Sequence, residues 1–193
     1  MYKKLQKFIL SIAILGVLAA PQLPTTVIAH DTELEQAPTL WDYQCLDTMK
    51  FSRDTSRQFL SDMVKAKKFI VDEINIIKSL GANCVAIATP YDEEFVPILT
   101  VWVDAARDAN LHVWFRGNFS AWENWFDYAR FTNEQQHHAA TRNFLLKHNN
   151  LLKPGDIFTP APEAENGIIG NVWESEQRKE RLRKFVVESY KNC

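Results

Sequence analysis

Short apolar runs alternate with longer segments of helical periodicity along this chain, and this alternation limits its fold more than any other feature. The runs are QCLDTM at 44–49, NCVAIAT at 83–89, LHVWF at 111–115 and DIFTPA at 156–161. Apolar runs of this length, each followed by polar residues, are typical of buried strands. Strands that alternate with helices predict a parallel sheet with helical crossovers.

The segments between the runs carry apolar residues at steps of three and four, as amphipathic helices do. The predicted helices cover about 59–80, 93–106, 132–145 and 174–191. Gly81 stands where the glycine that follows a helix is common. Thr132 with Gln135 three residues later has the pattern of a capping box at a helix start. The chain therefore reads as a strand and a helix repeated four times.

Two architectures fit this order: an open doubly wound sheet, or part of a (β/α)₈ barrel. The segment DTMKFSRD after the first predicted strand has neither glycine-rich phosphate-binding pattern, which disfavours nucleotide binding and favours the barrel. The predicted fold class is thus α/β, with about four of the eight units of a TIM barrel. In both architectures functional side chains gather at the carboxyl ends of the strands.

The first 29 residues have the pattern of a secretory signal peptide. A basic stretch at 2–7 precedes an apolar stretch at 8–20, and Ala29 supplies a small residue for cleavage. We predict cleavage after Ala29, a secreted or extracytoplasmic protein without a stable membrane anchor, and a partial barrel over 30–193. The alternative is a signal retained as an anchor.

Composition excludes several functional classes. The 193 residues are 46% hydrophobic and 24% charged with a formal net charge of −2, which is ordinary for a globular protein and gives no reason to expect nucleic acid as a partner. No metal is predicted, because no pair of cysteines has metal-ligand spacing. No cofactor is predicted either. Cys45 and Cys84 are interpreted as small core residues rather than a disulfide, and His137 and His138 as solvent-facing.

Polar and aromatic side chains follow each predicted strand. The candidate binding residues are Asp47, Tyr91, Arg116, Asn118, Trp122, Trp125 and Asn166, and the candidate catalytic residues are Glu163 and Glu165. Sugar hydroxyl groups bind polar side chains, and the C–H faces of a sugar ring pack on flat aromatic surfaces. The set therefore predicts an oligosaccharide or polysaccharide as the substrate.

Each of these residues also has a structural interpretation. The two glutamates could be solvated turn residues, and Arg116 could pair with a nearby acid. The tryptophans could belong to the core beneath a loop. Asp92, Glu93 and Glu94 could form the acidic start of the second predicted helix, where negative charge favours the helix dipole.

Four segments also carry a family resemblance: DTMKFSRD, GANCVAIATPYDEEF, VWFRGNFSAWENWF and GDIFTPAPEAENG. Over about residues 41–175 the chain resembles the amino-terminal half of a secreted bacterial glycoside-hydrolase-like (β/α)₈ family of the clan A superfamily. The resemblance implies retaining hydrolysis, with an acid/base glutamate after the fourth strand and a nucleophile after the seventh. By position the acid/base is Glu163 or Glu165, and Glu163 is closer to the strand end. The family's asparagine before this glutamate is replaced by Pro162, and Asn166 follows Glu165 instead.

A complete barrel needs about 250 residues, and the four units use the chain before a seventh strand is reached. We therefore expect a fragment of a longer reading frame, or self-association through exposed sheet edges. The alternative function is a non-catalytic carbohydrate-binding or cell-surface protein derived from a degenerate barrel. A third is a small open-sheet α/β protein with another role.

Overall fold

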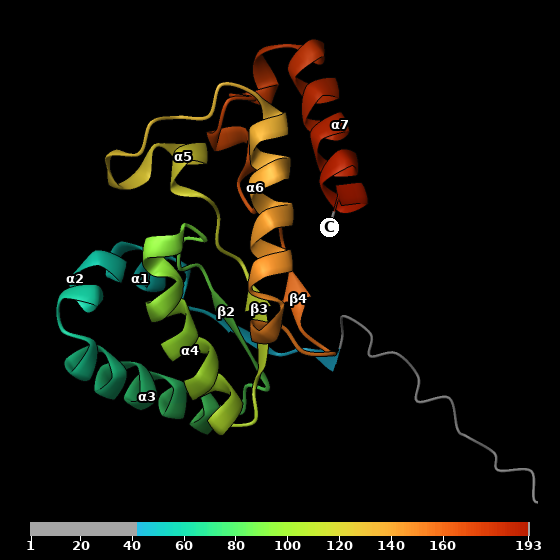
Figure 1. Ribbon diagram of the computed structural model, residues 1–193. Coiled ribbons are helices and arrows are strands. Elements are labelled where there is room, and N and C mark those ends of the chain that lie inside the picture. Colours follow the sequence, from blue (N-terminus) through green and yellow to red (C-terminus); the bar gives the residue numbers. More distant parts are fainter. Residues whose placement is uncertain (1–41, 193) are drawn as a thin grey trace, which may run out of the picture. The chain divides into compact units, whose positions relative to one another are not determined.

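Four parallel strands stand side by side in sequence order at the centre of the fold (Figure 1). In this computed structural model, which describes residues 42–192, they are β1 (Cys45–Asp47), β2 (Cys84–Ile87), β3 (His112–Phe115) and β4 (Ile157–Phe158). Each predicted apolar run contains one of them. Sequential order is that of consecutive (β/α) units, whereas a doubly wound sheet reverses its order. The predicted α/β class with parallel strands is confirmed, and the sheet is not closed.

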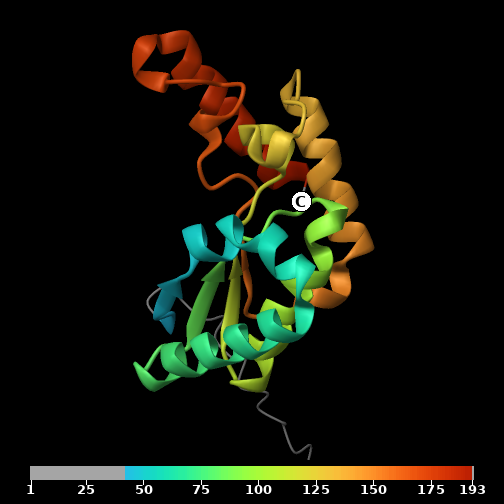
Figure 2. The same ribbon diagram turned by 90° about the vertical axis from the view of Figure 1, so that its left-hand side faces the viewer.

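Helices occupy the segments between the strands and after β4. They are α1 (Met49–Asp54), α2 (Ser56–Ser61), α3 (Met63–Ser79), α4 (Val96–Asp108), α5 (Ser120–Glu123), α6 (Glu134–Lys147) and α7 (Glu176–Asn192). Single 3₁₀ turns lie at η2 (Glu93–Phe95), η3 (Trp125–Asp127), η4 (Asn149–Leu151), η5 (Ala164–Asn166) and η6 (Val172–Glu174). The strands point toward the end of the fold that carries α1 and α5 (Figure 2).

Two helix boundaries differ from the sequence prediction. The predicted helix over 59–80 is divided, because the side chain of Asp62 accepts a hydrogen bond from the N–H of Lys65 and so starts α3. At the start of α6 the capping residue is Asn133, one residue later than predicted. Its partner Gln136 accepts from the N–H of the residue before the cap.

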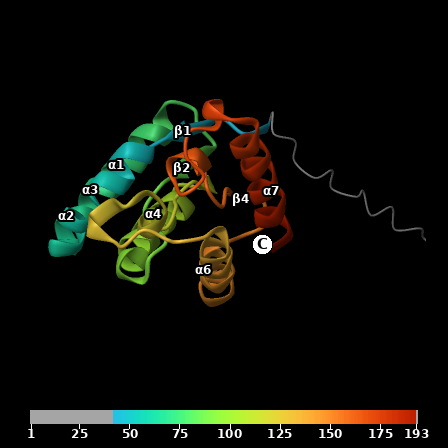
Figure 3. The same cartoon turned by 90° about the horizontal axis from the view of Figure 1, so that it is seen from above.

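The main core lies between the sheet and a layer formed by α3, α4 and α6 (Figure 3). Alternate strand residues point into it, because side chains in a strand alternate between the two faces. Val85, Ile87, Val113 and Phe115 are fully buried there. They pack with apolar side chains of the three helices, so the apolar face of the sheet and the apolar faces of the helices form one interface.

The opposite face of the sheet carries a disulfide that corrects a sequence prediction. Cys45 and Cys84 occupy paired positions at the first residues of β1 and β2, so their side chains point to the same face. They form a disulfide bond that closes a separation of 39 residues. Interpreting them as separate core residues was wrong, because only the pairing of the strands brings them together. Such bonds are typical of oxidising compartments, in agreement with the predicted export.

A second, smaller core joins the segment after β4 to α5 and α7. Trp122, Ala164, Ile169 and Phe185 are its buried members, and the ring of Trp122 stacks on Phe185 at 4.7 Å. Arg181 of α7 pairs with Glu134 at the start of α6, which ties these two helices together. The segment over 164–169 is therefore fixed against Trp122.

Within 42–192 no helix is long and apolar enough to cross a bilayer. The predicted signal peptide over 1–29 and its cleavage site lie outside the described residues. In the described sheet β1 and β4 are the edge strands, and self-association through them stays a prediction.

Candidate active site

Glu123, which the sequence analysis did not select, lies at the centre of the candidate site. It is the last residue of α5, the single turn that follows β3. The carboxylate of Asp92 accepts hydrogen bonds from the N–H of Ser120, at 2.8 Å, and from its hydroxyl group, and these bonds hold the first residue of α5. The turn ends at Asn124 in the left-handed region, with φ of 61°, a conformation that asparagine tolerates better than most residues. The backbone thus aims Glu123 toward the segment after β4.

Asn166 joins Glu123 to Glu163. Its Nδ2 donates to Oε2 of Glu163 at 2.7 Å and to Oε2 of Glu123 at 3.4 Å. The distance between Oε2 of Glu123 and Oε2 of Glu163 therefore cannot exceed the sum of these two hydrogen-bond lengths. A pair of carboxyl groups from two different segments therefore flanks one point at the carboxyl-terminal edge of the sheet.

Burial perturbs the carboxyl group of Glu123. Its pKa is raised to about 7, chiefly by desolvation and further by the negative charge of Glu163. Hydrogen bonds from Asn166 and Asn118 and the positive charge of Arg53 oppose this rise. A carboxylic acid with a pKa near neutrality beside a second carboxylate is the arrangement found in general acid catalysis.

Gly167 and Trp122 set the position of Glu163 and Asn166. A Cβ atom on Gly167 would lie 2.1 Å from the ring of Trp122, so only glycine lets the backbone pass so close to the indole. Trp122 is fully buried. Its predicted role as a sugar-stacking surface does not fit this position, because no face of the ring is open to a ligand.

Trp125 remains as an aromatic surface at the rim. The guanidinium group of Arg53 lies 4.6 Å from the centre of its ring, a cation–π contact. The guanidinium group of Arg53 is held by an ion pair with Asp54 at 2.7 Å. Helix α1 is tied to the end of β2, because Ser52 accepts a hydrogen bond from the N–H of Ala88 at 2.9 Å. Phe126 has φ of 54° and packs on Phe95 at 4.8 Å, so tertiary contacts sustain an uncommon backbone conformation beside Trp125.

Asp47, the last residue of β1, meets Arg116, the residue directly after β3, at the carboxyl-terminal ends of the strands. They form an ion pair in which the side chain of Arg116 is 23% exposed and that of Asp47 is 42% exposed. The guanidinium group also lies 5.4 Å from the centre of the Trp114 ring, and the indole N–H donates to the hydroxyl group of Thr159 at 2.8 Å. Both predicted residues are thus together on one surface, and the alternative that Arg116 pairs with a nearby acid is realised as well.

The remaining predicted residues fall into three environments. Tyr91 is buried, its hydroxyl group accepts from the N–H of Gly117 at 2.9 Å, and its ring packs in the core, so it supports the backbone of the site. Asn118 is buried beside Glu123, to which its Nδ2 donates at 3.4 Å. Glu165 is exposed.

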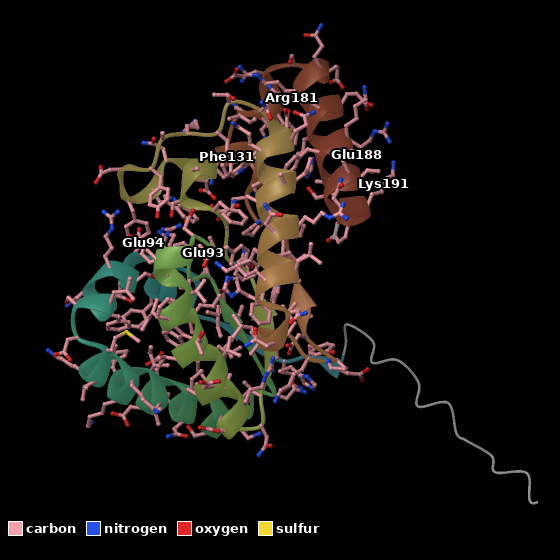
Figure 4. The ribbon with its side chains drawn as sticks, viewed as in Figure 1. Glu93, Glu94, Phe131, Arg181, Glu188 and Lys191 are labelled. Carbon is pink, nitrogen blue, oxygen red and sulfur yellow. A yellow bond between two sulfur atoms is a disulfide. The ribbon has the colours of Figure 1, made fainter. Side chains whose placement is uncertain are left out.

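Two further predictions on charged and titratable residues can be compared with the structure. His137 is fully buried, so its interpretation as solvent-facing was wrong, while the ring of His138 is partly exposed. Glu93 and Glu94 do lie directly before α4 (Figure 4). Glu93 also binds Lys147 at the end of α6, an ion pair of 2.8 Å.

One signal in the sequence could have identified Glu123. It is the sole carboxylate between Leu111 and Phe126, the segment that spans the third strand and its following turn. It was passed over because it lies eight residues beyond the strand, and residues at that distance reach the strand edge only if a turn brings them back.

These features define a parallel α/β domain with a carboxylate pair at the carboxyl-terminal edge of its sheet. Among the described residues there is no group of three or more histidine, cysteine, aspartate or glutamate side chains placed to hold a metal ion. No family model, no curated protein and no solved structure matches this chain.

Proposed function

We propose that this protein is a secreted glycoside hydrolase that cleaves β-linked polysaccharide with retention of configuration. The observation that carries the proposal is the pair formed by Glu123 and Glu163 around Asn166. The sequence resemblance to clan A glycoside hydrolases points to the same chemistry, and the sequential parallel sheet is compatible with it.

In the proposed reaction Glu123 is the proton donor. Its carboxyl group, with a pKa of about 7, protonates the glycosidic oxygen while Glu163 attacks the anomeric carbon. The C–O bond of the leaving group breaks, and a glycosyl ester forms on Glu163. Glu123 then removes a proton from water, which releases the sugar from Glu163. This reverses the role that the resemblance implies for Glu163, because the raised pKa belongs to Glu123.

The separation of the carboxyl groups favours retention over inversion. Inverting enzymes hold their two carboxyl groups about 6.5–9.5 Å apart to admit a water molecule, and retaining enzymes about 5–5.5 Å apart. The hydrogen bonds of Asn166, 2.7 Å and 3.4 Å long, hold one oxygen of each carboxyl group against the same amide nitrogen, which supports the shorter separation. A nucleophile from a seventh strand is not needed in this scheme.

Other residues at this edge would hold the sugar. Trp125 offers an aromatic surface beside the pair, and Arg53 braces it. The ion pair of Asp47 with Arg116 offers a carboxylate and a guanidinium group to sugar hydroxyls. Tyr91 and Trp122 are left out of the binding surface because both are buried.

Reducing ends released from a panel of β-linked polysaccharides test the proposal. We expect Glu123→Gln and Glu163→Gln each to lower turnover at least about 100-fold, the usual effect of removing a general acid or nucleophile. Glu165→Gln is the matched control, since this exposed glutamate is two residues from Glu163, and it should retain near-normal turnover. The rate should also fall above pH 7, as Glu123 loses its proton.

Unchanged turnover in Glu123→Gln would exclude the assigned proton donor. If no polysaccharide is cleaved, yet retention on an immobilised glycan is lost in Trp125→Ala and kept in Glu163→Gln, the non-catalytic carbohydrate-binding alternative is correct.

A further inference from the structure

A buried polar cluster adjoins Glu123 through the side chain of Asn118. Its members are His137 and Asn118, both with no exposed surface, and Thr141, 3% exposed. The imidazole ring of His137 lies among aromatic rings, 4.6 Å from Trp122 and 5.3 Å from Phe185. Burial of polar side chains in such surroundings lowers stability unless their hydrogen bonds are made. The cluster therefore invites a functional explanation.

The hydrogen bonds of the cluster have a fixed direction. The N–H of Phe119 donates to Oδ1 of Asn118 at 2.8 Å, which identifies the oxygen end of this amide. Nε2 of His137 lies 2.9 Å from the same oxygen and must carry the proton, because an oxygen acceptor cannot donate one. Nδ1 of the ring faces the hydroxyl group of Thr141 at 3.5 Å. With its oxygen held by two donors, Asn118 can only turn its Nδ2 toward Glu123, at 3.4 Å.

We infer that His137 is a positioning residue for the candidate active site: by holding the oxygen of Asn118, it directs the amide N–H of Asn118 at the carboxylate of Glu123. The inference rests on the proposed function only where activity is the readout. His137 does not touch the carboxyl pair itself, and its effect reaches Glu123 through one intervening side chain.

The surroundings of the His137 ring keep it neutral, so its hydrogen bonds do not change with pH near neutrality. Burial, and to a lesser degree the neighbouring His138, lower the pKa of His137 to about 3, so the ring is neutral at any pH at which Glu123 titrates. The backbone carbonyl of Pro160 is a second acceptor for the ring N–H. The remaining neighbours are aromatic rings and Thr141.

Glu123 itself is faced by four groups from three segments. These are Arg53 from α1, Asn118 from the end of β3, and Glu163 and Asn166 from the segment after β4. A hydrogen bond donated by an amide stabilises the ionised carboxylate, so the bond from Asn118 lowers the pKa of Glu123. Loss of that bond should raise this pKa further above 7.

The first test is the pKa of Glu123, followed by carboxyl carbon NMR in the full chain without substrate. In His137→Phe the amide of Asn118 loses one of the two donors on its oxygen, and we expect the pKa of Glu123 to rise by about half a unit or more. His137→Gln is the matched control, because its amide N–H can still donate, and it should stay near the wild-type value. An unchanged pKa in a folded His137→Phe protein would overturn the inference.

A second variant keeps the test decisive if His137→Phe does not fold. Asn118→Leu keeps the size of the side chain, but it has no N–H for Glu123 and adds no charge. We expect the pKa of Glu123 to rise here as well, because the hydrogen bond that stabilises its carboxylate is lost. No rise in Asn118→Leu would contradict the inference, since His137 acts on Glu123 only through that bond.

Failure of this inference can be told apart from failure of the proposed function. The NMR titration needs no substrate, so it remains valid if no polysaccharide is hydrolysed. If Glu123→Gln abolishes hydrolysis while His137→Phe leaves the pKa of Glu123 unchanged, the glycosidase stands and the positioning role falls. If both hold, the high-pH limb of activity should move upward in His137→Phe by the same shift.

Discussion

Asp156 and Glu123 are carboxylates at opposite ends of the strands of one sheet: Asp156 lies at the amino-terminal ends and Glu123 at the carboxyl-terminal ends. Their partners differ. Asp156, directly before β4, has a side chain only 3% exposed. It pairs with both terminal nitrogens of Arg107 and accepts from the backbone N–H groups of Val113 and Lys153, at 3.1 and 2.8 Å. Glu123, beyond β3, has two long amide contacts of 3.4 Å and a second carboxylate as its neighbour.

The difference separates a structural carboxylate from a reactive one. At the amino-terminal ends of the strands a matched cation and backbone donors satisfy the charge of Asp156, and the disulfide joins the first residues of β1 and β2. At the carboxyl-terminal edge the charge of Glu123 is left poorly compensated, so its proton is retained to higher pH. In barrel-type folds the first edge serves stability and the second serves function. Three predictions follow from this contrast, beginning with the largest effect.

Arg107→Met should cause the largest loss of stability. It leaves the carboxylate of Asp156 buried without its cation, which typically costs about 3–5 kcal/mol of unfolding free energy. Urea denaturation measures the loss. Lys68→Met is the control, since its ion pair with Asp72 is exposed on α3 and should contribute less than about 0.5 kcal/mol. Equal effects of the two variants would mean that burial of the Asp156 pair does not matter, and the contrast between the two edges would be lost.

Removal of the disulfide should have the next largest effect. Replacing both Cys45 and Cys84 with alanine reopens a loop of 39 residues, and we expect a loss of about 2–4 kcal/mol from the added freedom of the unfolded chain. Denaturation of the wild type with and without reductant should show the same difference, and the double variant should not respond to reductant. A wild type indifferent to reductant would show that the bond does not stabilise the amino-terminal edge.

Glu123→Gln should change the pH dependence of stability by a smaller amount. The pKa of Glu123 is about 7 in the folded protein against 4.5 in the unfolded chain, so between these values the folded state holds a proton that the unfolded state releases. The stability contributed by this group is therefore present below pH 4.5 and is lost as the pH rises through 7.

The measurement is the unfolding free energy of wild type minus that of Glu123→Gln, at pH 4 and at pH 8. This difference should fall by about 1–3 kcal/mol over the interval. Taking the difference removes the opposite contribution of His137, whose depressed pKa favours the folded state at higher pH in both proteins. A difference that does not change with pH would contradict the raised pKa and remove the contrast with Asp156.

The strands and most helices were predictable because their signals are local. The four apolar runs each contain a strand, and Gly81, with φ of 86°, follows α3 as predicted. The start of α6 was misplaced by one residue, because Thr132 and Asn133 are both good capping residues and only the geometry of Gln136 distinguishes them.

The candidate site was predicted less completely. Glu163, Asn166 and Trp125 were selected because they follow strand ends or expose aromatic rings. Trp122 was selected on the same grounds and is buried, because the segment at Gly167 closes over it. Glu123 was missed, and His137 was assigned to solvent, because a surface position and a buried one look alike on a helix with little apolar character.

The sequence by itself determined the alternation of strands and helices, because its apolar residues recur at the spacings of these elements. The parallel sheet, and the strand ends at which polar side chains gather, follow from that alternation. Only the tertiary structure decided which of those side chains meet. Asn166 contacts Glu123 across 43 residues of chain, and Cys45 reaches Cys84 across 39. Such contacts exist only once neighbouring strands are paired in register, and residue spacing along the chain carries no record of that pairing.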